Sequence, residues 1–369
     1  MSAALARLAR RRLASDRGTL AALASLVLIV LACLIGPVLT GHKPEQIYPD
    51  FVRVGPSLDA HPRADELRPA LTRLAFRMRL TLEDMRLEGD RVRLTLTASG
   101  RPVDERALRL LPRSGLFGSA EVLERAADGS RLVVALPVRK LTFLLGTDAL
   151  GRDLLTRCLA AGQVSLLIGL TATLAALLIG VSYGAVSGMA GGWVDALMMR
   201  LLDILYALPF VFFVIMLLVF FRAGLLLVMV AVAAVEWLDM ARIVRTQTLS
   251  LKGRDFFRAA TALGVGPGTI LVRHVVPNTL GPIIAAATLL VPRVILLESF
   301  LSFLGLGVQE PATSWGVLIA EGARALESAP WMLAAPAGFL VVTLVALNRL
   351  GDGLGEALDP RLQRDSAGR

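Results

Sequence analysis

The residues best suited to chemistry in this sequence are carboxylates that stand inside apolar stretches. Glu236 and Asp239 lie within one such stretch, and Glu298 ends another. A charge at the centre of a bilayer costs about 3 kcal/mol or more, so such side chains usually face protein or a water-filled cavity. One interpretation places Glu236 and Glu298 along a substrate pathway, where Glu298 attracts an amine. The other pairs Asp239 with Arg242 on the next turn and puts Glu298 at the membrane interface. We favour the ion pair for Asp239 and leave both interpretations open for Glu298.

Groups with catalytic or metal-binding spacing do not occur in the sequence. The three histidines and two cysteines are scattered, and no CxxC or HExxH pattern is present, which argues against a metalloenzyme or a disulfide framework. The phosphate-binding pattern GxxxxGK[ST] is missing too, because the glycines of 264–268 lack its lysine. We therefore expect that the chain is not an enzyme.

The composition is that of an integral membrane protein. Of the 369 residues, 55% are hydrophobic and the mean hydropathy is +0.65, which is too apolar for a soluble domain of this length. The formal net charge of +9 would suggest nucleic acid in a soluble chain, but here the arginines flank apolar runs. We expect membrane lipid around this chain and no nucleic acid as a partner.

About six apolar runs are long enough to cross a hydrocarbon core of ~30 Å. They lie at 20–39, 164–187, 197–221, 225–243, 280–297 and 332–347. A lipoprotein signal ending at Cys33 is the alternative for the first run, but the apolar residues continue past this cysteine, which favours an uncleaved anchor. The expected fold class is an all-α polytopic membrane protein with about six transmembrane helices.

Arginines and lysines in short flanks predict the orientation, because these charges resist translocation. They gather before the first run, between the fourth and fifth runs, and after the last, which six spans would place on one side. That side is the cytoplasm, so both termini are expected inside. The charges are Arg7, Arg10, Arg11, Arg12, Arg17, Arg242, Arg245, Lys252, Arg254, Arg258, Arg273, Arg349, Arg361, Arg364 and Arg369, with Arg222 as an exception on the outer side.

A polar segment between the first two runs falls outside the cytoplasm in this topology. Residues 76–99 alternate apolar and polar types around Glu88-Gly89-Asp90, which predicts a β-hairpin; 130–138 predicts a third strand and 120–126 a short helix. We expect a small α+β extracytoplasmic insertion domain. The predicted division is a cytoplasmic tail at 1–18, the first transmembrane helix at 19–40, the insertion at 41–145, a core with five transmembrane helices at 146–360, and a cytoplasmic tail at 361–369.

Small and capping residues predict how the core helices begin and pack. The stretch GTDALGRD at 146–153 is typical of a turn before a helix, with Thr147 or Asp148 as the cap. Gly184, Gly188, Gly191 and Gly192 are interpreted together as packing and turn residues, rather than as ligand contacts.

The cytoplasmic loop at 246–277 is longer than a plain connection between two spans requires. Phe256, Ala259, Ala260 and Leu263 recur at helical spacing, and Gly264 begins a run of glycine and proline that ends the helix. The loop is thus predicted to form a helix, a turn and a second helix, and Pro277 is predicted to start the next span. From the residues alone, the first helix either receives a partner protein or rests on lipid headgroups.

The segment RAATALGVGPGTILVRHVVPN at 258–278 resembles the EAA loop of inner-membrane permease subunits of ATP-binding cassette importers. Ala259, Ala260, Gly264 and Pro277 match that pattern, whereas Arg258 replaces the usual glutamate. The resemblance covers about two thirds of the chain and includes LGTDALGRDLLTR, ESFLSFLGLGVQEPATSW and NRLGDGLGEALDPRL. Together these stretches are similar to the C-type permease subunit of oligopeptide or dipeptide importers. The segment 41–142 departs from that family.

The resemblance implies a multi-pass subunit of the bacterial inner membrane that works by alternating access. Its partners would be a second permease subunit in a heterodimer, two cytoplasmic ATPases, and an extracytoplasmic peptide-binding protein. ATP and Mg²⁺ would bind to the ATPases, so this chain would hold no cofactor. The ATPase-coupling residues would be Arg254, Asp255, Phe256, Arg258, Ala259, Ala260, Gly264 and Pro277.

Alternatives to peptide import remain at this point. Within the family, the cargo could be a modified peptide, an opine or a nickel complex. Outside it, the chain could be a secondary transporter or channel that needs no ATPase, or a membrane-anchored signalling or enzymatic module that works in 51–140.

Overall fold

The computed structural model describes residues 16–98, 102–127, 129–221 and 224–358, and the chain divides into two compact units. One unit comprises Met1–Leu39, Cys158–Arg324 and Leu333–Arg369, and the other comprises Thr40–Arg157 and Ala325–Met332. The tail at 361–369 and most of the tail at 1–18 lie outside the described residues. So do several charges of the orientation argument, namely Arg7, Arg10, Arg11, Arg12, Arg222, Arg361, Arg364 and Arg369.

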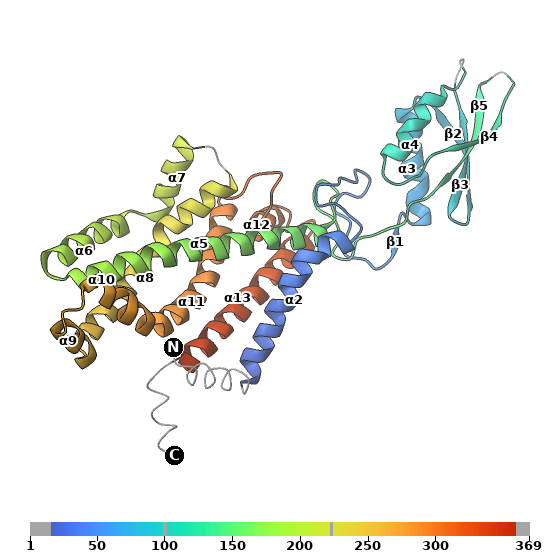
Figure 1. Cartoon of the computed structure of the whole chain (residues 1–369). Helices are drawn as coiled ribbons and strands as arrows, with labels where there is room; N and C mark the ends of the chain where they lie inside the picture. The colour runs from blue at the N-terminus through green and yellow to red at the C-terminus, as the bar shows by residue number, and fades with distance from the viewer. Residues whose placement is uncertain (1–15, 99–101, 128, 222–223, 359–369) are drawn as a thin grey trace. The chain divides into compact units, whose positions relative to one another are not determined.

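Helices make up the first unit (Figure 1). This is the structure expected of apolar runs in lipid, because a helix bonds its own backbone N–H and C=O groups. The helices are α2 (Arg17–Leu39), α5 (Leu154–Ala190), α6 (Gly192–Ala207), α7 (Phe210–Phe220), α8 (Leu225–Lys252), α9 (Asp255–Ala262), α10 (Pro267–Ile270), the π-helical turn η2 (Leu271–Val275), α11 (Val276–Phe303), α12 (Trp315–Arg324) and α13 (Trp331–Leu358).

Four helical segments of the described residues are long and apolar enough to cross a membrane: Arg17–Leu39, Leu154–Ala190, Pro267–Phe303 and Trp331–Ala357. The pair α6 and α7, bent by 81° at its break, makes a fifth candidate. Helix α8 has the necessary length, but it carries Glu236, Asp239 and Arg242 and does not meet the same criterion of length and composition. The structure thus gives four or five of the six expected spans.

Glycines let α5 and α8 approach each other closely. A Cβ added at Gly184 would overlap the carbonyl oxygen of Ala241, and one at Gly188 would lie 2.7 Å from Cβ of Thr248. Both glycines are therefore packing residues, as predicted, in the way that small residues join helices in lipid. Gly191 and Gly192 have φ angles of +66° and +56° at the turn between α5 and α6, which confirms them as turn residues.

The second unit contains an antiparallel sheet in the order β2-β3-β5-β4. Its strands are β2 (Thr81–Glu88), β3 (Arg91–Thr97), β4 (Glu121–Arg125) and β5 (Arg131–Pro137); β1 (Ala60–His61) pairs separately with β6 (Leu141–Thr142), and the helical elements are α3 (Ala64–Arg77), η1 (Glu105–Arg109) and α4 (Leu110–Arg113). Glu88 pairs with Arg91 and Gly89 has a φ of +63°, which confirms the predicted hairpin. The third predicted strand is confirmed as β5.

The helix predicted at 120–126 is wrong, because this segment contains the edge strand β4. Val122 pairs with Val134 of β5, and the exposed Glu124 accepts from Arg93 of β3 at 2.8 Å. So short a segment fits both helical and strand periodicity, and its pairing with β5 decides its structure.

The second unit has a hydrophobic core of its own. Leu71 and Leu74 of α3 belong to the same buried cluster as residues of β3 and β5 such as Leu94 and Val134. Strand alternation places these residues on one face. Arg91, Arg93 and Arg131 pair instead with exposed carboxylates two strands away in the sheet, at Glu121, Glu124 and Glu83.

The cap predicted for the first core helix is also corrected. Asp153 caps α5, since its side chain accepts from the backbone N–H of Thr156 at 2.7 Å. Asp148 accepts from the backbone N–H groups of Leu150 and Arg152 and pairs with Arg157 at 2.6 Å. The turn at 146–153 thus needs both aspartates, one for the turn and one for the helix.

Candidate functional site

The predicted break in the loop at 246–277 occurs at Gly264. This residue has a φ of +75°, a left-handed conformation that glycine adopts without strain. The backbone N–H of Val265 donates to the carbonyl of Ala260 at 3.1 Å, closing the end of α9. The second helix then runs through α10 and η2 into α11, with Pro277 near its start. The predicted sequence of helix, turn and helix is therefore confirmed.

One side of α9 packs against the rest of the unit and the other side is exposed. Ala260 is buried in a cluster with Ile270 and Val275, against which Met189 and Leu251 pack. By contrast, the predicted loop residues Arg254, Asp255, Phe256, Arg258, Ala259 and Gly264 are exposed, and Pro277 is half-buried. Leu263 is 83% exposed and Phe256 39% exposed. The exposed side of α9 thus presents apolar area beside charged side chains.

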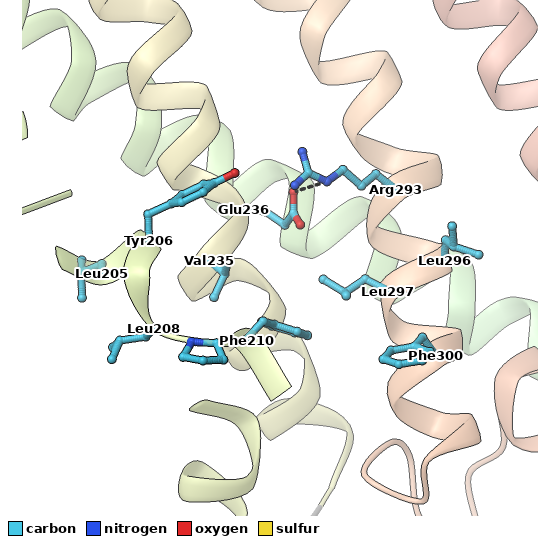
Figure 2. A pocket seen from close by; sticks show the side chains of 11 residues that line it. Leu205, Tyr206, Leu208, Phe210, Val235, Glu236, Arg293, Leu296, Leu297 and Phe300 are labelled. Carbon is cyan, nitrogen blue, oxygen red and sulfur yellow. Dashed lines mark ion pairs between the residues drawn. The ribbon is translucent and has the colours of Figure 1, made fainter. Parts of the chain in front are cut away.

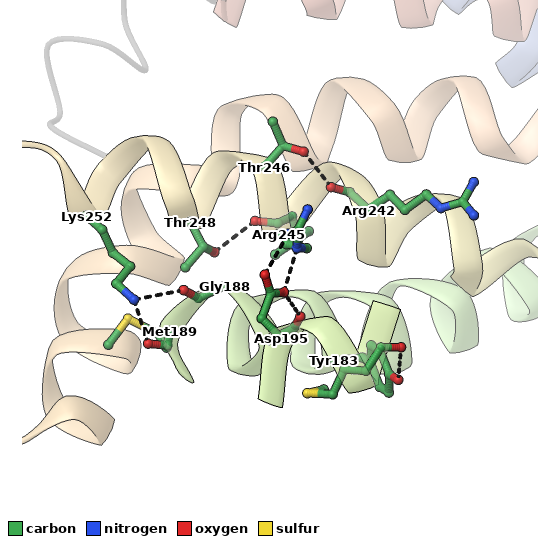
Figure 3. A network of polar contacts seen from close by, with 12 residues as sticks. Tyr183, Gly188, Met189, Asp195, Arg242, Arg245, Thr246, Thr248 and Lys252 are labelled. Atoms are coloured by element: carbon green, nitrogen blue, oxygen red, sulfur yellow. Dashed lines mark hydrogen bonds and ion pairs between the residues drawn. The ribbon is translucent and has the colours of Figure 1, made fainter. Parts of the chain in front are cut away.

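A polar joint fixes the end of α8 to the corner between α5 and α6 (Figure 3). Arg245 Nε and Nη2 donate to both carboxylate oxygens of Asp195, each at 2.6 Å. Ser187 at the end of α5 also donates to Asp195. Lys252 Nζ donates to the last carbonyls of α5, at 3.2 Å to Gly188 and 2.8 Å to Met189. The loop helix α9 follows this joint directly in the chain.

A groove of about 680 Å³ opens among α6, α7, α8 and α11 (Figure 2). Most of its lining is apolar, and its charged residues are Glu236 and Arg293. The lining residues are Leu205, Tyr206, Leu208, Pro209, Phe210, Val235, Glu236, Arg293, Leu296, Leu297 and Phe300. An apolar pocket with few polar groups is the usual form of a small-ligand site.

The charges at this groove pair between helices rather than within one. Arg293 of α11 donates through Nη1 to Asp239 at 2.7 Å, and its Nε lies 3.5 Å from Oε2 of Glu236. Arg242 donates to Asp203 of α6 at 2.9 Å and stacks over the Tyr206 ring at 4.4 Å. The predicted pair of Asp239 with Arg242 is therefore wrong, because each residue has a partner on a neighbouring helix.

Glu298 is separated from the groove. Its side chain is fully buried, and it accepts hydrogen bonds from Ser302 at 2.6 Å and Ser165 at 3.2 Å. The sequence left a pathway position and an interfacial position open for Glu298, and the structure shows that these serines hold its carboxylate inside the packing of α5 and α11. Of the two carboxylates predicted for a substrate pathway, Glu236 lines a groove and Glu298 joins helices.

Sequence reasoning missed Arg293, Asp195 and Arg245 as members of these sites. Arg293 had a usable signal, because it is a charge inside the apolar run 280–297, as Glu236 is inside 225–243. Asp195 and Arg245 had no comparable signal, since each stands near the end of an apolar run where charges are common.

Comparison with known proteins places the chain in a family. Residues 172–364 match the family described as binding-protein-dependent transport system inner membrane component, and residues 4–56 match the N-terminal transmembrane domain of oligopeptide transport permease C. The chain belongs to this family of inner membrane components and is a multi-pass membrane protein. Residues 57–171, which include the sheet, lie between the two matched regions.

Individual relatives extend the match. The oligopeptide transport system permease protein OppC of Escherichia coli (strain K12) is 56% identical over 216 residues, which cover 58% of this chain and 72% of that protein. The dipeptide transport system permease protein DppC of Bacillus subtilis (strain 168) is 46% identical over 220 residues, covering 59% and 69%. A solved chain of the MetNI methionine ABC transporter aligns over 56% of this chain and 96% of its own, with a TM-score of 0.47 and 17% identity. The two sequence relatives confirm the resemblance drawn from the loop.

Proposed function

We propose that this chain is one of two permease subunits of an ATP-binding cassette importer that carries oligopeptides or dipeptides across the bacterial inner membrane. The observation that carries this proposal is the 56% identity to OppC over 216 residues. The relatives named for oligopeptides and for dipeptides are both close, so peptide is the cargo class they share. The permease pair moves its cargo by alternating access and hydrolyses no ATP itself.

We further propose six spans, with α8 as the sixth. Its charges do not oppose this assignment, because Asp239 pairs with Arg293 and Arg242 pairs with Asp203 on neighbouring helices. Six spans place both termini and the loop 246–277 in the cytoplasm and the unit with the sheet outside. Single cysteines at Arg258 and at Leu123 of β4 test this, using a membrane-impermeant maleimide on intact cells. Labelling at position 123 alone is expected, and labelling of both positions from outside would refute the topology.

The exposed side of α9 is the proposed docking surface for an ATPase. It presents Arg254, Phe256 and Arg258 beside the exposed Leu263, and Ala260 anchors the opposite side. ATP and Mg²⁺ bind to two partner ATPases, a second permease completes a heterodimer, and an extracytoplasmic binding protein delivers peptide. Movement of α9 reaches α5 and α6 through the joint at Lys252 and Arg245.

Two glycines of the loop provide a matched test of coupling. Gly264→Val places a branched side chain at a φ of +75°, where it is strained, whereas Gly268→Val fills open space in ordinary backbone. In proteoliposomes with the whole importer, Gly264→Val should abolish ATP-driven peptide uptake and Gly268→Val should retain it. Charge reversal of Arg254 and Arg258 should also abolish uptake. Membrane insertion should be normal in every case, and normal uptake by Gly264→Val would contradict the coupling role.

A further inference from the structure

Glu236 has a buried carboxylate oxygen without a hydrogen-bond donor. The residue is 3% exposed, and its Oε2 makes no hydrogen bond to any described residue. Arg293 Nε lies 3.5 Å away, which is an ion pair but beyond the usual length of a hydrogen bond. Leaving a buried charged oxygen without a donor is unfavourable, so a donor supplied by a ligand would be stabilised there.

The charges around the groove leave one negative charge in excess. Glu236 and Asp239 share the guanidinium of Arg293, while Arg242 has Asp203 as its own partner. Arg293 can therefore turn away from Glu236 and remain paired with Asp239 at 2.7 Å. Its side chain is 55% exposed, which leaves room for this movement. A small cationic group suits the Glu236 end of the groove.

The rest of the groove is apolar. Figure 2 shows Glu236, Arg293 and Tyr206 together at one end, with Phe210, Leu297 and Phe300 on the other side of the space. A volume of about 680 Å³ lies within the range of pockets for small ligands. The matching ligand carries an ammonium group next to an apolar side chain.

We propose that this groove binds the free α-ammonium group of a peptide on Glu236, with the apolar side chain of the first residue against Leu297 and Phe300. Arg293 then stays paired with Asp239, and its position controls access to the carboxylate of Glu236. The inference rests on the proposed function and deepens it, because it assigns a specificity-determining residue to the permease. A lipid tail would fill only the apolar end and would leave Glu236 without a donor.

Uptake by the whole importer in proteoliposomes tests the proposal with tri-leucine and N-acetyl-tri-leucine. Glu236→Gln keeps the shape of the side chain and removes its charge. The matched control is Glu124→Gln, which removes the charge of an exposed carboxylate of β4 that pairs with Arg93 and does not line the groove. We expect Glu236→Gln to lower kcat/KM for tri-leucine about ten- to a hundredfold and that for the acetylated peptide less than threefold. Glu124→Gln should leave both unchanged. The preference of the binding protein cancels, because each variant is compared with wild type on the same peptide.

Direct binding to the purified complex in nanodiscs, without the binding protein, is the second measurement. Wild type should bind tri-leucine at least tenfold more tightly than the acetylated peptide, and Glu236→Gln should remove this difference. Leu297→Trp leaves Glu236 and Arg293 in place and fills the apolar end of the groove. It should therefore weaken the binding of tri-leucine more than the binding of tri-glycine. Equal effects of Glu236→Gln on the free and acetylated peptides would overturn the inference. Peptide uptake by the wild-type importer would in that case still support the proposed function. Absence of any peptide uptake by wild type would overturn the proposed function itself.

Discussion

Two arginine–carboxylate groups in the helical unit differ in how completely they are bonded. Arg245 meets both oxygens of Asp195 at 2.6 Å, and Ser187 adds a third donor. Arg293 instead divides its donors between Asp239 at 2.7 Å and Glu236 at 3.5 Å, and one oxygen of Glu236 has no hydrogen bond. A fully bonded pair holds its helices in one geometry, whereas an incompletely bonded one can accept another donor. We therefore assign a structural role to the first group and a binding role to the second.

Breaking the joint between α8 and α6 should have the largest effect. Arg245→Met leaves the buried Asp195 without its bidentate partner, which should destabilise the subunit by on the order of 2 kcal/mol. Thermal unfolding of the purified complex measures this loss, and uptake should fall with it. Arg245→Lys keeps the positive charge but cannot donate to both carboxylate oxygens as the guanidinium does. Its melting temperature should therefore lie between those of wild type and Arg245→Met. A melting temperature equal to wild type in Arg245→Met would mean that the joint is not structural.

Removing one of the two carboxylates that pair with Arg293 should have a smaller effect on stability and a clear effect on peptide binding. In Asp239→Asn, Glu236 is the remaining carboxylate partner of Arg293. The free energy of unfolding, followed through the melting temperature, should fall by about 1 kcal/mol or less. The guanidinium should then stay on Glu236 and compete with an ammonium group. Tri-leucine binding in nanodiscs should weaken several-fold, and unchanged binding would show that Arg293 does not control access to Glu236.

An exposed pair of the sheet unit should have the smallest effect. Arg93 donates to Glu124 at 2.8 Å, and their side chains are 38% and 67% exposed. Water and salt screen such pairs, so Arg93→Gln should change stability by less than about 1 kcal/mol. Its melting temperature and peptide uptake should match wild type. A loss as large as that of Arg245→Met would mean that burial and bonding do not distinguish the charged groups.

Several features were predictable because they depend on neighbours in sequence. The break at Gly264 follows from glycine's tolerance of positive φ, and the hairpin around Gly89 follows from alternation on both sides of a turn. The segment 120–126 was not predictable in this way, because pairing with β5 determined its structure. The partner of Asp239 was missed because Arg293 is 54 residues away in sequence and meets it only through the packing of α8 and α11.

The amino-acid sequence alone shows that this is a membrane protein, where its helices break and which family the loop resembles. These features depend on local composition and residue spacing, which the amino-acid types set directly. The choice of partner for each charge followed from which helices lie side by side. Arg242 pairs with Asp203 of α6, and Arg293 pairs with both Glu236 and Asp239. Glu298 is buried and accepts a hydrogen bond from Ser302. Electrostatic attraction and burial act through space, so only the packed helices could separate a structural carboxylate from one that lines a groove.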